Sequence, residues 1–369
     1  MSQTGIPKLV GQSQSQGHHA QSQGLNMNPL PAGPRTIVRT PQVGLISRVA
    51  DCCVWFGRYV ERSESTAREL QATRHLALDG ELTARQCWFP MIVIAGEARP
   101  VHDKHGDAVV EDGEWVQSYL VWEDECGVSL RRSVRAAREN ARAIRDVLSG
   151  EVWESINQLH LWIGADAARI EWDTHRDSFY RHVRQSAQLS LGHLRSTMLH
   201  DCVLDFIWLG MLLERIGQTA RLLDVHHHAF ASSSAHPVVE TAVWVALLRG
   251  LSGYEPYLKN VGALTAEAVA AFLVSEVRFP RSIAYCVKAA RERLTALVPP
   301  DQTAGQTALA RLRALDDWLR AVSSERWESG SLHQMLTHVV DESAAVFDLL
   351  GRDLLGYAPA PTPPPDVET

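Results

Sequence analysis

The chain has 369 residues, of which 45% are apolar and 21% are charged, so it holds enough hydrophobic material for a large folded core. Its 36 basic and 43 acidic residues give a formal charge of -7. This balance argues against a protein that binds nucleic acid mainly by charge, because such proteins concentrate positive charge against the phosphates. We therefore expect a folded protein that has no nucleic-acid partner.

Both ends of the chain have compositions typical of disorder. Residues 1–42 are rich in Gln, Ser, Gly and Pro, and residues 358–369 are dominated by proline, so neither tail can bury enough surface to offset chain entropy. The amino terminus lacks an apolar signal-peptide core, and the longest nearly apolar stretch, 202–213, is too short to cross a bilayer. The six cysteines show no CxxC spacing and are typical of reduced core thiols. These features predict a cytoplasmic protein without membrane association.

Between the tails, apolar residues recur every three or four positions, which predicts helices. The first is a long helix over 45–79. The stretch 96–117 has clustered Gly, Pro and Asp without a helical period, so it predicts an inserted loop or small hairpin. Further helical patterns follow at 129–148, 151–164, 174–197, 199–229, 237–252, 265–274, 280–297, 303–323 and 331–355. No run of alternating residues competes with them, so the predicted fold is all-α over residues 43–357.

Two of the helical segments resemble each other. WFGRYVERSESTARELQATRH (55–75) and WLGMLLERIGQTARLLDVHHH (208–228), 153 positions apart, are identical at nine of 21 positions without a gap. Further matches follow in the same order, at Trp88 and Trp244, Leu120-Val121 and Leu273-Val274, and Arg132-Ser133 and Arg281-Ser282. Collinear matches indicate tandem copies, at a period far above that of solenoid repeats. We expect an internally duplicated, pseudo-two-fold helical bundle with repeat 1 at 45–160, repeat 2 at 199–297 and C-terminal helices at 303–355.

The duplicated segment carries a stripe of polar residues spaced by seven, which lie along one line because seven residues advance a helix by nearly two turns. The two trios are Glu61, Arg68 and His75, and Glu214, Arg221 and His228. The apolar surroundings of Glu214 and Arg215 predict that both enter the bundle interior, where an ion must be paired. Reciprocal pairing of Glu61 with Arg215 and of Glu214 with Arg62 meets this requirement.

Two interpretations of the stripe remain open. The ions can form a buried structural network that sets the register of the two halves. Alternatively, an arginine-rich inner surface made by Arg62, Arg68, Arg215 and Arg221 can hold a peptide carboxylate or a phosphate. We predict no metal and no cofactor, because the paired Glu-x-x-His motif and a phosphate-cradling glycine loop are both absent from the sequence. No residue can be assigned a catalytic role.

Four segments, GRYVERSESTAR, SVRAARENARAIRDVLSGEVWESINQL, LGMLLERIGQTARLLDV and RFPRSIAYCV, together resemble the bacterial alpha-E family, helical proteins named for a recurrent Glu-Arg motif. The resemblance runs from Leu45 to Tyr357, and the motif matches Glu61-Arg62 and Glu214-Arg215. It implies partners encoded nearby: a circularly permuted ATP-grasp ligase, a transglutaminase-like peptidase and sometimes an Anbu-type peptidase. The long Gln-rich amino tail and the acidic stretch WEDECGVSL depart from the family pattern.

The preferred hypothesis is therefore a non-catalytic binding or scaffold subunit that works with an ATP-grasp peptide ligase and a transglutaminase-like protein on small peptides. The alternative is an enzyme that acts on a peptide or aminoacyl carboxylate held by the Arg/Glu stripe. A second alternative is a purely structural homodimer.

Overall fold

The computed structural model describes residues 45–79, 82–231, 237–322 and 329–357, without the side chains of 228–231, 237 and 329–330. Over these ranges the regular secondary structure is helical and contains no strand, as predicted from the sequence. The helices are α1 (Ser47–Leu78), α2 (Ala84–Ile94), α3 (Ala98–His105), α4 (Gly113–Trp122), α5 (Leu130–Ala143), α6 (Gly150–Ile163), α7 (Asp166–Thr174), α8 (Arg176–Thr197), α9 (Cys202–Ala231), α10 (Pro237–Gly250), α11 (Tyr254–Asn260), α12 (Ala266–Ser275), α13 (Ile283–Leu297), α14 (Gln306–Val322) and α15 (Ser329–Asp353). Two short 3₁₀ helices span Asp107–Glu111 and Arg145–Val147. The tails predicted at 1–42 and 358–369 lie outside the described residues.

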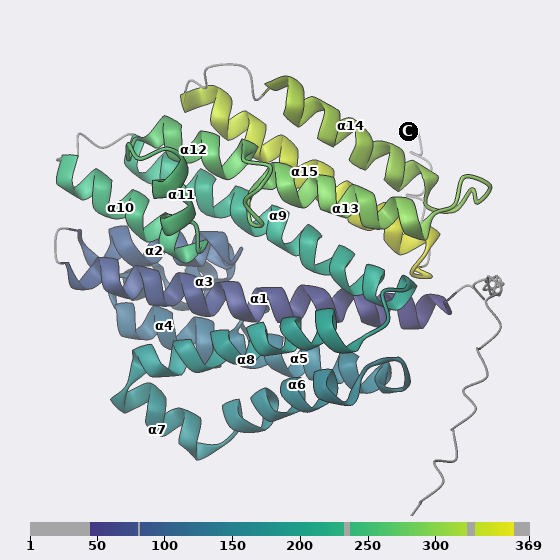
Figure 1. Ribbon diagram of the computed structural model, residues 1–369. Coiled ribbons are helices and arrows are strands. Elements are labelled where there is room, and N and C mark those ends of the chain that lie inside the picture. The colour runs from purple at the N-terminus through teal and green to yellow at the C-terminus, as the bar shows by residue number, and fades with distance from the viewer. Residues whose placement is uncertain (1–44, 80–81, 232–236, 323–328, 358–369) are drawn as a thin grey trace, which may run out of the picture. The chain divides into compact units, whose positions relative to one another are not determined.

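Helices α1 and α9 lie side by side and form the centre of the bundle (Figure 1). Helices α5, α8 and α10 pack against α1, whereas α13 and α15 pack against α9. Helix α6 covers α8 and α5, and α14 covers α13 and α15. The segments that carry the two Glu-Arg motifs are therefore both surrounded by other helices, which explains their burial.

The backbones of α1 and α9 touch where two glycines meet the opposite helix. A Cβ atom added at Gly57 would lie 2.0 Å from the carbonyl oxygen of Ile207, and one added at Gly210 would lie 2.0 Å from that of Val54. Any side chain at either glycine would force the helices apart, because neither carbonyl can rotate out of the way. The close approach brings the polar residues of the next turns within reach of each other.

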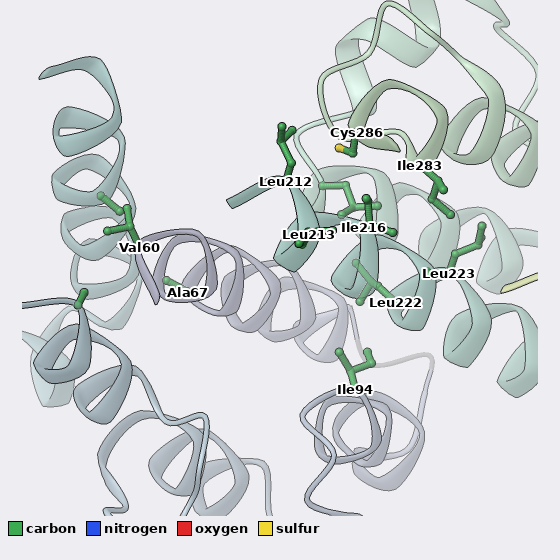
Figure 2. Packing of buried hydrophobic residues seen from close by; sticks show 14 of the residues in the cluster. Val60, Ala67, Ile94, Leu212, Leu213, Ile216, Leu222, Leu223, Ile283 and Cys286 are labelled. Atoms are coloured by element: carbon green, nitrogen blue, oxygen red, sulfur yellow. The ribbon is translucent and has the colours of Figure 1, made fainter. Parts of the chain in front are cut away.

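Aliphatic side chains fill the space around this crossing. Figure 2 shows buried residues from α1, α9 and α13, among them Val60, Ile216 and Ile283. Each of these is at most 1% exposed, so an ionised group among them is cut off from water. Such a group must find its hydrogen bonds within the protein.

The loop or hairpin predicted over 96–117 is wrong, since this stretch folds into α3, the 3₁₀ helix Asp107–Glu111 and the start of α4. Pro100 is the third residue of α3, where the missing N–H has no helical acceptor in any case. Gly106, with φ of 76°, ends α3, and the Asp112 carboxylate accepts hydrogen bonds from the first turn of α4. The turn-forming residues thus mark helix ends and do not indicate a long loop.

Every helical segment predicted from the periodicity coincides within a few residues with an observed helix. The pattern missed α2, α7 and α11, which are 11, 9 and 7 residues long. Helices of this length show only two or three repeats of the apolar spacing, so tertiary packing decides their conformation. Helix α2 carries a further sequence signal, a capping box in which Thr83 and Gln86 bond each other's backbone N–H groups.

Candidate functional site

The Glu61 carboxylate is fully buried and saturated with hydrogen bonds from arginine. Arg215 of α9 donates from Nε and Nη2, at 3.0 and 2.6 Å, and Arg281 donates from Nη1 at 2.6 Å. The Ser65 hydroxyl donates from the next turn of α1 at 3.1 Å. Burial by itself would raise the pKa of Glu61, but the two guanidinium groups outweigh it and lower the pKa to about 2. Glu61 is therefore ionised at neutral pH.

Glu214 has a matching environment on the other helix. Arg62 donates to both carboxylate oxygens, at 2.7 and 3.0 Å, and Arg58 adds a bond from Nε at 2.8 Å. The arginines again overcome the effect of burial and lower the pKa of Glu214 to about 2. Glu61 with Arg215 and Glu214 with Arg62 are the two reciprocal pairs predicted from the sequence.

Arg281 and Arg58, the second partners of the two carboxylates, were not assigned to them from the sequence. Arg281 lies 220 positions from Glu61 and belongs to the short match that aligns it with Arg132. That alignment was the one feature of the sequence that singled out Arg281, but it does not indicate which carboxylate the guanidinium contacts. Arg58 is one turn before Glu61, yet it crosses to Glu214 because its side chain points toward α9.

Arg68, the next residue of the first stripe, has its own carboxylate. It pairs with Glu64, one turn earlier in α1. Glu64 also accepts a bond from Arg281 at 2.6 Å and one from Gln188 of α8 at 3.1 Å. Glu64 was not among the residues predicted from the sequence, although its spacing of four from Arg68 is the one that pairs charges along a helix. Arg68 is thus held within the same network as Glu61.

Arg221 occupies the corresponding place in α9 but forms no ion pair or hydrogen bond with any residue of the described ranges. One turn earlier the chain has Gly217, which supplies no carboxylate. The guanidinium lies between two hollows that share Arg221 and Glu214. One, of about 240 Å³, lies between α1, α2 and α9, and the other, of about 160 Å³, lies between α1, α9 and α15. We call the larger one the Arg221 cavity.

Two more polar groups of the Arg221 cavity are unsatisfied. The Oε1 atoms of Glu69 and Gln218 are buried and have no hydrogen-bond partner. Burial raises the pKa of Glu69 to about 8, although Arg221 and Arg281 act in the opposite direction, so this carboxyl is protonated at neutral pH. A neutral carboxyl, an amide oxygen and an unpaired guanidinium therefore face one small cavity. This set can bind a carboxylate while accepting a hydrogen bond from a neighbouring donor.

The histidines of the stripe lie apart from the buried ions. His75 is at the surface, where its Nε2 lies 3.1 Å from an oxygen of Asp177, which also pairs with Arg74 at 2.9 Å. The side chain of His228 lies outside the part of the chain that the structure describes. No three His, Cys, Asp or Glu side chains gather into a metal-binding group within the described ranges.

The six cysteines are free thiols, which agrees with the sequence interpretation. Burial raises the pKa of Cys87 to about 11 and those of Cys126 and Cys286 to about 12. A thiol with such a pKa is protonated at neutral pH and is a poor nucleophile.

Among the described helices, none is long and apolar enough to pass through a bilayer.

Comparison with known proteins agrees with the sequence resemblance. The model of the Alpha-E family, described as a predicted alpha-helical domain with a conserved ER motif, matches residues 45–355. The chain belongs to this family. It is 26% identical over 265 residues to an uncharacterised protein of Mycobacterium bovis and, to the same extent, to uncharacterised proteins of Mycobacterium tuberculosis. These alignments cover 67% of this chain but only 29% of the relatives. No solved structure matches the chain.

Proposed function

We propose that this Alpha-E protein is a non-catalytic binding or scaffold subunit that works in the cytoplasm with an ATP-grasp peptide ligase and a transglutaminase-like peptidase on small peptides. The observation that carries the proposal is that the carboxylates of the Glu-Arg motif are paired with arginines and ionised. Both oxygens of Glu61 and of Glu214 accept hydrogen bonds from arginines that are buried or largely buried, and both carboxyls have a pKa lowered to about 2. A general acid or base needs a pKa nearer the working pH, so the motif is suited to holding the bundle together.

The relatives support a role in combination with other protein segments. The chain spans 29% of the length of the mycobacterial proteins that it matches, so the similar region is a minor part of each of them. A helical unit that is combined with other sequence in some proteins is well suited to act as a subunit in others. The ligase and the peptidase are the partners that the family resemblance implies.

The proposal includes the pseudo-two-fold relation of the two halves. Two independent sets of contacts support it. In each set, a contact recurs when both of its residues are replaced by the residues at the equivalent positions, 153 residues away. The first is the pairing of Glu61 with Arg215 and of Glu214 with Arg62. The second is the contact of Gly57 with Ile207 and of Gly210 with Val54.

Turnover of the neighbouring ATP-grasp ligase, measured with and without this protein, tests the proposal. We expect the two proteins to elute together on gel filtration and the ligase activity or solubility to change on addition of this chain. The isolated chain should not hydrolyse ATP. Arg58→Lys is the control variant. It retains a positive charge beside Glu214, so it should fold and affect the ligase as the parent chain does. Absence of a complex together with an unchanged ligase rate would contradict the scaffold role.

A second candidate function is favoured by the Arg221 cavity. In this alternative the chain handles a peptide or aminoacyl carboxylate, which binds to the unpaired Arg221 and hydrogen-bonds to Glu69 or Gln218. Arg221→Gln should then abolish ligand-dependent activity in a protein that remains folded, whereas Arg74→Gln, at a half-buried position outside this cavity, should not. A homodimer without any small ligand is the remaining alternative, and it predicts equal activity in both variants.

A further inference from the structure

A second hollow, separate from the Arg221 cavity, is lined by four arginines. Arg68 of α1, Arg181 and Arg184 of α8 and Arg249 of α10 surround a space of about 540 Å³. We call it the arginine basin. Its other lining residues are Gln71, Ala72, His75, Ser252 and Glu255. Arg68 and Gln71 are buried at its base, while Arg181 and Arg249 are exposed at its rim.

The charges of the arginine basin are not balanced within the described part of the protein. Arg181 and Arg249 have no carboxylate partner there, and Arg184 donates only to the neutral Gln71 amide, at 2.6 Å. Arg68 shares Glu64 with Arg281. Among the described residues that line the basin, Glu255 is the only one with a carboxylate. Counting three arginines without a carboxylate against Glu255, the basin carries an excess of two positive charges.

Asp177, which contacts His75 of the basin, is already engaged. Asp177 of α8 accepts from Arg74 at 2.9 Å and lies 3.1 Å from Nε2 of His75. It therefore does not neutralise the rim arginines. Burial lowers the pKa of Arg68 to about 9, and the neighbouring Arg281 and Arg184 act in the same direction. Like charges are thus crowded together at the base of the hollow.

Two of the arginines that line the basin each have one unsatisfied hydrogen-bond donor. The Nε atoms of Arg68 and Arg184 are buried and have no hydrogen-bond partner. A buried donor without an acceptor costs free energy, and the cost is larger when the donor is charged. An anion within the basin would supply the missing negative charge, and its oxygens would accept from the guanidinium nitrogens that face the hollow.

The rim shows a strained residue. Ser252 has φ of 54° and is the one non-glycine residue of the described ranges in the left-handed region. It ends α10 in a turn where its own N–H bonds the Arg249 carbonyl at 3.1 Å and that of Gly253 bonds Leu248 at 2.7 Å. Glycine is the usual residue at this place. A serine there costs conformational energy but puts a hydroxyl donor at the edge of the basin, and such strain is concentrated at functional sites.

We propose that the arginine basin binds the phosphoryl group of a small soluble phosphate ester. A phosphate monoester dianion matches the excess of two positive charges. Its three terminal oxygens can accept from several guanidinium groups at once, whereas one carboxylate offers only two oxygens. The volume of about 540 Å³ leaves room for the organic group that carries the phosphate. This site shares Arg68 with the network around Glu61 but does not involve Glu61 or Glu214, and it does not depend on the proposed ligase partner.

Isothermal titration calorimetry on the full chain tests the proposal, with inorganic phosphate and phenyl phosphate as probes and succinate as a dicarboxylate of equal charge. All titrations are made at the same ionic strength. We expect both phosphates to bind saturably, and Arg184→Gln and Arg249→Gln each to weaken binding at least about tenfold. The matched control is Arg99→Gln on α3, whose side chain is 93% exposed and lies outside the basin, and it should bind as the parent protein does. Arg249 is exposed, so its replacement should leave the helical circular dichroism unchanged.

Three results would overturn the proposal. These are the absence of saturable phosphate binding, equal affinity for succinate and phenyl phosphate, and unchanged affinity in both basin variants. A further arm uses vesicles that contain phosphatidic acid. Binding to the vesicles without binding to free phosphates would assign the basin to a membrane surface and reject the soluble ester.

Discussion

Arg68 and Arg221 stand at matching positions of α1 and α9, each seven residues after a buried glutamate, but their surroundings differ. Arg68 has Glu64 one turn earlier, and this carboxylate binds Arg68 and Arg281 together. Arg221 has Gly217 at that place, and its guanidinium is left without a partner beside a cavity. One residue in the preceding turn therefore decides whether the arginine has a carboxylate partner on its own helix.

The largest effect should come from removing the central carboxylates. Glu61→Ala and Glu214→Ala each leave buried arginines uncompensated, which costs about 3–5 kcal/mol of unfolding free energy. We expect Glu61→Ala to be the worse of the two. Its partners Arg215 and Arg281 are 10% and 11% exposed, whereas Arg62 and Arg58, the partners of Glu214, are 15% and 20% exposed and are closer to water.

Chemical denaturation measures both variants. Asp103→Ala, which breaks an exposed pair with Arg99, is the control and should change the stability little. A loss for Glu61→Ala no greater than that of the control would contradict the buried-network account.

The glycines at the crossing test whether the two halves are equivalent. Gly57→Ala and Gly210→Ala each place a Cβ atom against a carbonyl oxygen of the other helix, which overpacks the contact and should cost about 1–3 kcal/mol. Because the contacts are reciprocal, the two losses in thermal stability should be similar. Gly150→Ala is a suitable control, since nothing lies within 4 Å of its added Cβ. A clear loss at one crossing glycine and none at the other would contradict the pseudo-two-fold relation.

Glu69, which lines the Arg221 cavity, should make the free energy of unfolding depend on pH. Its folded pKa of about 8 is above the ordinary value of 4.5, so between these values the folded state keeps a proton that the unfolded chain releases. The contribution of protonated Glu69 to the free energy of unfolding is fully present below pH 4.5 and is lost as the pH rises toward 8. Glu69→Gln removes this dependence, and at pH 8 the variant should be more stable than the parent by an amount on the order of 1–3 kcal/mol.

Denaturation of both proteins at pH 5 and pH 8 checks this result. Near pH 5 the parent and Glu69→Gln should have similar stability, because the unfolded carboxyl is then close to its ordinary pKa of 4.5 and little free energy is needed to keep Glu69 protonated in the folded state. A stability difference that does not change with pH would show that Glu69 is ionised in its cavity.

The smallest effect is expected at Gly217. Replacing a glycine inside a helix by alanine stabilises it by up to about 1 kcal/mol. The new Cβ atom would lie 3.0 Å from Nη1 of Arg221, the end of a flexible side chain that has no partner to lose. Gly217→Ala should therefore have a slightly raised melting temperature in differential scanning calorimetry. A marked loss of stability would mean that Arg221 is fixed in place, as Arg68 is.

The long helices could be predicted from the sequence because their apolar spacing repeats over several turns. Helix α1 was predicted at 45–79 and spans Ser47–Leu78. The short helices could not be predicted in this way. Helix α7, for example, buries only Ala168 and Trp172 and shows little periodicity. The Gly, Pro and Asp residues of 96–117 were interpreted as a loop, whereas they cap and separate helices. Local patterns do not reveal whether a turn residue ends a helix or begins a loop.

The sequence alone determined the reciprocal pairs of the Glu-Arg motif, because a buried ion needs a partner and the second copy of the motif offers one of opposite charge. Only the tertiary structure decided the rest of the site. It brings Arg281 to Glu61 across 220 positions and places Arg181, Arg184 and Arg249 around one hollow. It also leaves Arg221 unpaired while Arg68 is bound. These outcomes depend on how helices that are distant in the sequence pack together, and the spacing within one helix carries no information about that packing.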